Sequence, residues 1–340
     1  MGVDIGSLFH EETITFDDLE NRVIAIDAYN VLHQFLASIR QRDGTPLKDA
    51  KGEVTSHLSG LFQRTANLME AGIKPVYSFD GKPHPLKVQT LEMRKQRKIQ
   101  AEREYQIALA KGDLATARSK AQQTGRLTDS MIEETKELLT ALGIPFVQAP
   151  AEGEAQACYI VQKNDAYAVA SQDFDCLLVG SPILIRNLTS TGKRKVPSKE
   201  AYKKIYVKQI RLEENLEKLE ITQKQLVDMA ILIGTDFNQG IYGIGPKKSL
   251  KLIKEYETIE QVLETFDFED KPTSEMISLI RTIFLKPDVT DSYNLIWNNP
   301  DEKEVIRILC DTHQFGKSRV LETLSKYEQK KKGTTQETLF

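Results

Sequence analysis

Four acidic residues occur as two short pairs that could bind metal ions. Glu152 and Glu154 follow a proline and open an apolar, helix-favouring run, where acidic side chains suit the positive end of a helix dipole. Asp173 and Asp175 follow the apolar run 167–171, which predicts a short buried strand. Ligands of open α/β sheets bind beyond the carboxyl ends of the strands. Both pairs could therefore face one ligand at such an edge.

Three more aspartates stand at the ends of apolar runs. Asp27 ends the run 23–27 and Asp80 ends the run 76–80, while Asp236 closes an apolar run of helical character. A single aspartate after a strand is usually a helix cap or a turn residue, so each alone is weak evidence. Seven carboxylates in such positions argue for a shared site. Oxygen ligands suit Mg²⁺ or Mn²⁺ rather than zinc.

Strands and helices alternate along most of the chain. The strands are predicted from apolar runs at residues 22–27, 76–79, 144–147 and 167–171. This alternation predicts an α/β fold, a mostly parallel twisted sheet flanked by helices on both sides. Residues 183–186 and 195–196, joined by a basic turn, are predicted to form a hairpin that finishes the sheet.

Composition indicates a globular protein of a reducing compartment. Of the 340 residues 40% are hydrophobic, which is enough for a substantial core. The net charge of −3 argues against an indiscriminate nucleic-acid binder. Three widely spaced cysteines indicate neither a disulfide framework nor a zinc site. No apolar run of about 18 residues could span a bilayer.

Positive charge is nevertheless concentrated between residues 82 and 126. Eleven basic residues stand there against four acidic ones, a local charge of +7. Lys87 and Arg94 are seven residues apart, so they share one face of a helix predicted to begin near Leu86. Such a stretch can hold phosphates by Coulomb attraction and counterion release. A solvated helix face is the ordinary alternative.

A glycine-rich turn follows Asp236. Gly243 and Gly245 precede a proline and the cations Lys247 and Lys248, which places backbone N–H groups and positive charge at the start of a helix. This arrangement suits a phosphate of double-stranded DNA. No base-reading side chain is apparent, so the predicted grip is independent of DNA sequence.

Five motifs together resemble the flap endonucleases, the structure-specific 5′ nucleases of the XPG/RAD2 family. They are IAIDAYN at 24–30, PVYSFDGKP at 75–83, APAEGEAQA at 149–157, ASQDFDCLL at 170–178 and LIGTDFNQGIYGIGPKKSL at 232–250. The resemblance implies a fold with a 5′-nuclease (PIN-like) core and two Mg²⁺ ions, for which Mn²⁺ can substitute. It assigns one ion to Asp27, Asp80, Glu152 and Glu154, and the other to Asp173, Asp175 and Asp236. Lys87 and Arg94 are then the basic pair at the scissile phosphate.

The same resemblance implies several DNA contacts. Helices between residues 92 and 123 correspond to an arch over a single-stranded 5′ flap, and the glycine-rich turn to a helix-hairpin-helix that also binds K⁺. His33 stands where the family has an aromatic residue that stacks on a base, and Arg40 shares its helix face; packing of His33 against the core is the alternative. An unpaired 3′ nucleotide would enter a pocket formed by Leu47, Thr55, Gln314, Phe315 and Arg319.

The resemblance also implies the organisation of the chain. One nuclease core over residues 1–329 comprises an N-terminal region 1–99, the rest of the arch 100–126, an internal region 127–258 with the helix-hairpin-helix at 234–255, and C-terminal helices 259–329. Residues 330–340 form a tail in which Gln336, Leu339 and Phe340 resemble part of a binding box for the sliding clamp (PCNA). An ordinary tail is the alternative. We expect a monomer without membrane contact, in the cytoplasm of an archaeal-type source rather than in a nucleus.

The predicted function is a 5′ flap endonuclease with 5′-3′ exonuclease activity, acting in Okazaki fragment maturation and long-patch base excision repair. A related 5′ nuclease that cuts gaps, ends or junctions would share all seven acids. A catalytically silent DNA-binding scaffold on the sliding clamp is an alternative of another class, and cleavage of labelled flap DNA in Mg²⁺ distinguishes it.

Overall fold

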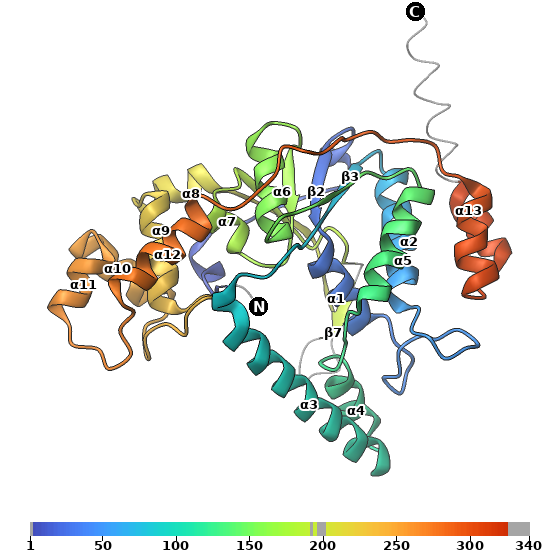
Figure 1. Cartoon of the computed structure of the whole chain (residues 1–340), viewed down its shortest axis with the longest axis horizontal. Coiled ribbons are helices and arrows are strands. Elements are labelled where there is room, and N and C mark those ends of the chain that lie inside the picture. The colour runs from blue at the N-terminus through green and yellow to red at the C-terminus, as the bar shows by residue number, and fades with distance from the viewer. Residues whose placement is uncertain (1–2, 191–192, 196–201, 326–340) are drawn as a thin grey trace, which may run out of the picture.

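The computed structural model describes residues 3–190, 193–195 and 202–325. Its centre is a seven-stranded sheet (Figure 1). In spatial order the strands are β1 (Glu12–Ile14), β9 (Val207–Arg211), β6 (Ile183–Arg186), β5 (Ala168–Ala170), β2 (Val23–Asp27), β3 (Lys74–Phe79) and β4 (Phe146–Gln148). The five strands from β6 to β4 are parallel, while β9 and β1 pair antiparallel at one end. The predicted mostly parallel α/β sheet is therefore confirmed.

Helices cover both faces of the sheet, and strand residues alternate between the two resulting cores. Ile24 and Ile26 of β2 pack on one side and Ala25 on the other. The Ile24 face is covered by α1 (Ala28–Ser38), α2 (Ser56–Glu70), α5 (Asp129–Ala141), α13 (Glu302–Ile306) and the π-helix η4 (Arg307–Thr312). The Ala25 face is covered by α6 (Gly153–Gln162), α7 (Asp175–Val179) and α9 (Gln223–Ile233) (Figure 1).

The strand order creates a switch point beside β2. From β2 the chain adds β3 and then β4 on one side, and later β5 and β6 on the other. Loops leaving β2 and β5 at their carboxyl ends therefore diverge, which opens the sheet edge where ligands bind in such folds. The aspartates predicted at strand ends lie at this edge, since Asp27 is the last residue of β2 and Asp173 follows β5.

A helical hairpin projects from the sheet edge (Figure 1). After the 3₁₀ turn η3 (Pro85–Lys87), α3 (Val88–Ala110) and α4 (Leu114–Ala121) pack on each other. The break falls at 111–113, as predicted, where Asp113 caps α4 by accepting from the Thr116 N–H. Their shared core consists only of Tyr105, Leu109 and three alanines. This hairpin contains most of the +7 segment.

The remaining α-helices contribute to the core on the Ala25 face. They are α8 (Leu212–Leu219), α10 (Pro246–Tyr256), α11 (Ile259–Thr265) and α12 (Ser274–Leu285). Near the N-terminus, the 3₁₀ turn η1 (Gly6–Leu8) precedes β1, and η2 (Asp17–Leu19) precedes β2. An extended segment, 286–301, then leads to α13, and Trp297 anchors it by donating to the Pro75 carbonyl at 2.8 Å. No helix among the described residues is long and apolar enough to cross a membrane.

The predicted hairpin between 183–186 and 195–196 is wrong. Strand β6 pairs with β9 instead, and β7 (Lys193–Lys195) pairs with β8 (Tyr202–Lys204) in a separate two-stranded sheet. The partner of β6 is thus more than twenty residues away in sequence. Alternation of apolar residues identifies a strand but does not identify its partner.

Candidate active site

Hydrogen bonds between the loops after β3 and β4 carry the first group of acids to the sheet edge. Gly81 and Lys82 donate to the carbonyls of Ala151 and Pro150. Asp80 Oδ1 accepts from the Gly153 N–H at 2.7 Å. A Cβ at Gly153 would lie 2.8 Å from that oxygen and 3.0 Å from the Asp80 backbone nitrogen, so only glycine allows this approach. Glu152 and Glu154, at the start of α6, are thereby held beside Asp80.

Asp27 and Asp173 are joined through one asparagine. Asp27 caps α1 by accepting from the Asn30 N–H at 3.0 Å, and the Asn30 side chain donates to Asp173 Oδ2, also at 3.0 Å. Asn30 therefore connects the carboxyl ends of β2 and β5, which are adjacent strands. The prediction that these acids share one edge is confirmed by this contact.

Asp175 and Glu154 are oriented by other neighbours. Asp175 Oδ1 accepts from the Val3 N–H at 2.8 Å, so the N-terminal segment reaches the site. The Cys176 thiol donates to Glu154 Oε1, with 2.8 Å between sulfur and oxygen. These two contacts fix the orientations of the Asp175 and Glu154 carboxylates.

Burial and mutual repulsion raise the pKa values of these acids. For Asp27, burial and then the charge of Asp80 raise the pKa to about 8. For Asp80, burial and the charge of Glu152 raise the pKa to about 6. For Asp175, burial and the charge of Asp173 raise the pKa to about 6 as well. Burial likewise raises the pKa of Glu154 well above its usual value. Such a cluster is poorly stabilised as anions unless a cation joins it.

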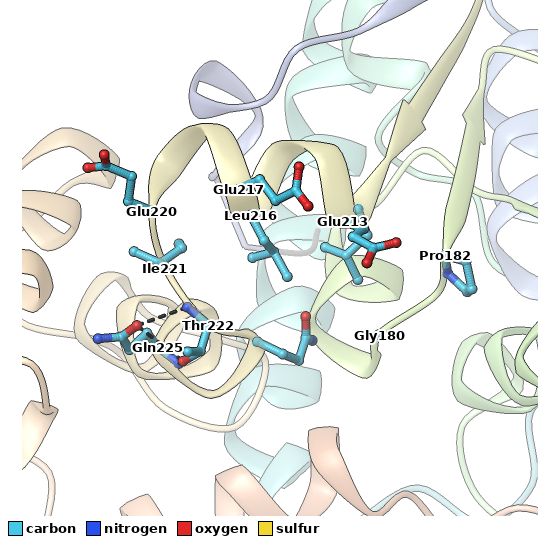
Figure 2. A pocket seen from close by; sticks show the side chains of 11 residues that line it. Gly180, Pro182, Glu213, Leu216, Glu217, Glu220, Ile221, Thr222 and Gln225 are labelled. Atoms are coloured by element: carbon cyan, nitrogen blue, oxygen red, sulfur yellow. Dashed lines mark hydrogen bonds between the residues drawn. The ribbon is translucent and has the colours of Figure 1, made fainter.

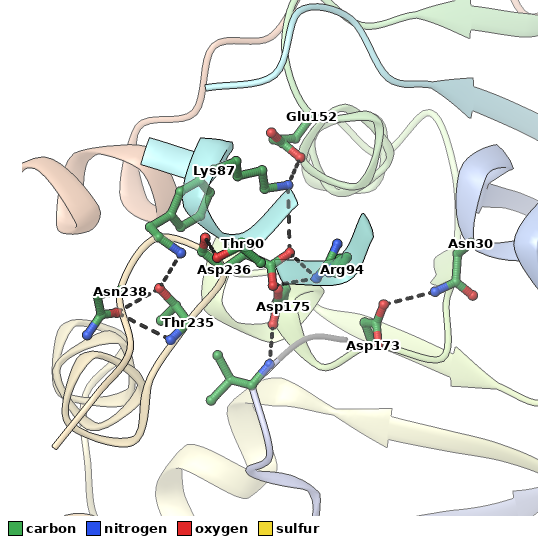
Figure 3. A network of polar contacts seen from close by, with 12 residues as sticks. Asn30, Lys87, Thr90, Arg94, Glu152, Asp173, Asp175, Thr235, Asp236 and Asn238 are labelled. Carbon is green, nitrogen blue, oxygen red and sulfur yellow. Dashed lines mark hydrogen bonds and ion pairs between the residues drawn. The ribbon is translucent and has the colours of Figure 1, made fainter. Parts of the chain in front are cut away.

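Lys87 and Arg94 form ion pairs with Glu152 and Asp236 (Figure 3). The Lys87 ammonium forms a short ion pair with Glu152 and lies 4.0 Å from Asp236 Oδ2. Arg94 Nη2 contacts both oxygens of Asp236, at 2.5 and 2.7 Å. Thr90, between them on α3, donates to the Asp236 carbonyl at 2.8 Å. The start of the hairpin is thus attached to the acids, and Asp236 is drawn toward α3.

The donor set fits a hard cation. It consists of carboxylate oxygens, and its buried members gain most from added positive charge. Within the described ranges, no three acidic, histidine or cysteine side chains are already placed to hold one ion. Lys87 and Arg94 explain much of this, since they hold Glu152 and Asp236. In this arrangement, the carboxylates of Glu152 and Asp236 are therefore neutralised by side-chain cations.

The predicted base-stacking residue faces outward. His33 lies on α1 with its ring exposed, so the alternative of core packing is wrong. Partial loss of water to nearby protein atoms, together with the positive charges of Lys98 and Arg94, lowers the pKa of His33 below its usual value. The ring is therefore neutral at neutral pH. Arg40 instead donates to the carbonyls of Leu36 and Gly44, which leaves less of its guanidinium available for DNA.

The predicted helix-hairpin-helix lies between α9 and α10. Gly240, in the left-handed region at φ +74°, packs so close to α9 that a Cβ would lie 2.2 Å from the Ile233 carbonyl oxygen. Gly243 and Gly245 lead into α10, whose first turn carries the exposed Lys247 and Lys248.

The five residues predicted to bind a 3′ nucleotide line one cavity of about 290 Å³. Leu47 and Thr55 lie on one wall, and Gln314, Phe315 and Arg319 on the other. A larger open cavity of about 670 Å³ lies against Pro182, Leu212 and Glu217 (Figure 2). It adjoins the start of β6, at the edge opposite the acids, and therefore belongs to a different part of the molecule.

Four contributors to the site were missed by sequence reasoning. Asn30, Thr90, Cys176 and the Val3 N–H each contact an acidic residue. Asn30 offered a signal, because it stands three residues after the capping Asp27, in the first turn of the same helix. The other three act across long sequence separations. Gln336, Leu339 and Phe340 lie outside the described residues.

Comparison with known proteins gives concordant results. Residues 8–101 match the XPG N-terminal domain and residues 143–236 match the XPG I-region. Flap endonuclease 1 of Pyrococcus abyssi is 50% identical, over 100% of this chain and 97% of its own, and that of Thermofilum pendens is 51% identical over 96% and 95%. The structure of flap endonuclease-1 from Methanococcus jannaschii superimposes with a TM-score of 0.76 at 40% identity, covering 96% of this chain and 98% of its own. With half of its residues shared over its full length, and with the acids gathered at one sheet edge, the chain belongs to the flap endonuclease family.

Proposed function

We propose that the chain is a metal-dependent 5′ flap endonuclease that hydrolyses a phosphodiester bond of flapped DNA near the junction of single and double strands. The observation that carries this proposal is the convergence of buried, mutually repelling carboxylates with Lys87 and Arg94 at one sheet edge. The names of its half-identical relatives support the same substrate. A scaffold without catalysis would have no use for such a costly cluster.

The ligands are divided between two Mg²⁺ ions, with Mn²⁺ as a substitute. Asp27, Asp80, Glu152 and Glu154 would hold one, and Asp173, Asp175 and Asp236 the other. These carboxylates would hold the ions where they could activate a water molecule and stabilise the leaving oxygen. Asn30 fixes the orientation of the Asp173 carboxylate, and the Gly153 N–H fixes that of Asp80.

Lys87 and Arg94 would exchange partners during the reaction. In the free protein they neutralise Glu152 and Asp236. Once those carboxylates turn inward, the two cations are available to phosphoryl oxygens, where fixed positive charge stabilises the transition state. The neutral, exposed ring of His33 is placed to stack on a neighbouring base, with less area than a larger aromatic ring would offer.

Duplex DNA would be gripped away from the acids and without regard to sequence. The start of α10 suits the phosphate backbone of one DNA strand, since it presents backbone N–H groups together with Lys247 and Lys248. A K⁺ ion at carbonyls of the Gly243–Gly245 turn would strengthen this grip. The α3–α4 hairpin would enclose the 5′ flap, and the 290 Å³ cavity would take one unpaired 3′ nucleotide.

The wider setting follows from this activity. The same site would remove nucleotides from 5′ ends, and the enzyme would act in Okazaki fragment maturation and long-patch base excision repair. Its tail would bind the sliding clamp through Gln336, Leu339 and Phe340. We expect a monomer when free, in the cytoplasm beside the chromosome, as befits relatives from archaea.

Cleavage of matched labelled substrates tests the proposal. Nicked, 5′-flapped and four-way DNA are incubated with the full chain in Mg²⁺ and with EDTA. We expect Mg²⁺-dependent incision close to the flap junction and little cutting of the four-way substrate. Preferred cutting of four-way DNA would indicate a junction nuclease instead, and no cutting of any substrate would indicate a scaffold.

A further inference from the structure

Asp49 joins the two segments that form opposite walls of the 290 Å³ cavity. Its Oδ2 lies 3.1 Å from Nδ1 of His313, and the two side chains are only 1% and 7% exposed. Its Oδ1 accepts from the N–H groups of Lys51 and Glu53, each at 2.9 Å. One carboxylate therefore organises the turn of its own loop and also holds the residue that follows η4.

A second contact lies beside the first. Gln314 accepts from the Ala50 N–H through Oε1 at 3.0 Å and donates to the Thr312 carbonyl through Nε2 at 2.8 Å. Its backbone is left-handed, at φ +55°, which is unfavourable for a residue with a Cβ. Such a conformation persists where neighbouring contacts enforce it, and His313 is the adjacent anchor.

The cavity depends on how these two segments are placed. Leu47 and Thr55 flank the loop that Asp49 organises, and the Thr55 N–H donates to the Leu47 carbonyl at 2.8 Å. Phe315 comes directly after Gln314, and Arg319 lies four residues beyond Phe315. A shift between Asp49 and His313 would therefore move one wall against the other.

We propose that the Asp49–His313 contact is a positioning element that fixes the width of this cavity and so sets the preference for DNA carrying one unpaired 3′ nucleotide. This inference rests on the proposed flap endonuclease function. Asp49 and His313 act through the cavity walls and take no part in the chemistry. His313 supplies the donor, and an asparagine at the same position would present an N–H close to where Nδ1 stands.

The test compares two flap substrates that differ only by one unpaired 3′ nucleotide. For each protein the ratio of kcat/KM on the two substrates is measured. His313→Ala should lower this ratio about fivefold, mostly through KM on the substrate with the 3′ nucleotide, as expected for the loss of one buried hydrogen bond. His313→Asn should restore most of the ratio. Asp311→Ala, an exposed neighbour in η4, is the matched control and should keep the wild-type ratio.

Each outcome separates this inference from the function on which it rests. A wild-type ratio in His313→Ala, or an Asn variant no better than the Ala variant, overturns the positioning role. If His313→Ala does not fold, His313→Leu, which keeps much of the side-chain size but has no polar atom, must lower the ratio in its place. A wild-type protein that cuts flaps but ignores the 3′ nucleotide defeats this inference alone. One that cuts no flap defeats the proposed function.

Discussion

Lys87 and Arg94 hold Glu152 and Asp236 in the free protein, although their proposed targets are phosphoryl oxygens. Removing either cation should therefore slow the chemical step more than it weakens DNA binding. We expect Lys87→Ala and Arg94→Ala to lower the single-turnover rate by about 100-fold, with affinity changed only a few-fold. Rapid-quench cleavage and fluorescence anisotropy measure the two quantities.

Lys95 provides the matched control for this pair. It lies on α3, is largely exposed, and pairs with Glu92, one turn away. Lys95→Ala should retain the wild-type rate. If Lys87→Ala and Arg94→Ala changed only affinity, the transition-state role would be wrong.

The raised pKa of Asp27 predicts how stability depends on pH without metal. In the unfolded chain its pKa is near 3.8, and in the folded protein it is about 8. Folding thus favours the protonated form, and this contribution, complete below pH 3.8, is lost as the pH rises toward 8. Asp27→Asn keeps the capping oxygen and removes the charge. In EDTA, its Tm relative to wild type should increase steadily from pH 5 to pH 8.5.

Thermal melts across that pH range provide the measurement. Asp270→Asn, a change at an exposed site, should show no such trend. At pH 8.5, saturating Mg²⁺ should raise the Tm of the wild type more than that of Asp27→Asn. The reason is that the negative charge of Asp27, which repels the other acids, also binds the ion. A constant Tm difference between Asp27→Asn and wild type would contradict the proposed cause of the raised pKa.

Residues that end a strand were predictable, whereas residues that orient them were mostly not. Asp27 and Asp80 end apolar runs, and such runs can be read from a sequence. Cys176 reaches Glu154, and Thr90 the Asp236 carbonyl, across 22 and 146 positions. These contacts depend on tertiary packing, which no local pattern encodes.

At the scale of elements, the α3–α4 hairpin is held by very little apolar contact. Tyr105 is the largest side chain of its small core and is 6% exposed. Tyr105→Ala should therefore loosen the hairpin while leaving the two main cores and the global Tm almost unchanged. Hydrogen exchange should become faster across residues 100–121, and single-turnover flap cleavage should slow.

Leu114→Ala serves as the control, because Leu114 lies on the same hairpin but is 55% exposed. It should leave exchange at wild-type rates. Unchanged exchange in Tyr105→Ala would show that the hairpin is held by contacts other than this core.

Helices and strands were predicted better than their pairing. The break at 111–113 and the strands β2 to β5 follow from local signals such as Gly112 and apolar runs. The pairing of β6 with β9 was missed because twenty residues separate these strands in sequence, and β7 and β8 among them pair with each other instead. Closing a loop of about twenty residues costs little more conformational entropy than closing a short turn, so proximity in sequence is a poor guide to which strands pair.

At the scale of the whole molecule, the described residues place the acids and the start of the α3–α4 hairpin at one sheet edge, while a single core over 1–329 stays a prediction. The tail tests a separate function. Deleting residues 336–340 should leave flap cleavage without clamp unchanged and abolish stimulation by the sliding clamp of the same source. Replacing Lys330–Lys332 by alanine is the control, since it keeps the Gln336 box. A truncated protein that still responds to the clamp would contradict the assignment of Leu339 and Phe340.

The account as a whole depends on carboxylates that hold metal at the sheet edge, and Asp175 tests this most directly. It belongs to the proposed second ion site and accepts a hydrogen bond from the Val3 N–H. The decisive measurement is single-turnover cleavage of 5′-labelled flap DNA over a Mg²⁺ titration, with DNA affinity measured in parallel. Asp175→Ala should abolish cleavage at every Mg²⁺ concentration while binding DNA within a few-fold of wild type, because one ligand and one repelling charge are lost. Cleavage by Asp175→Ala at saturating Mg²⁺, at a rate near that of wild type, would contradict the metal site.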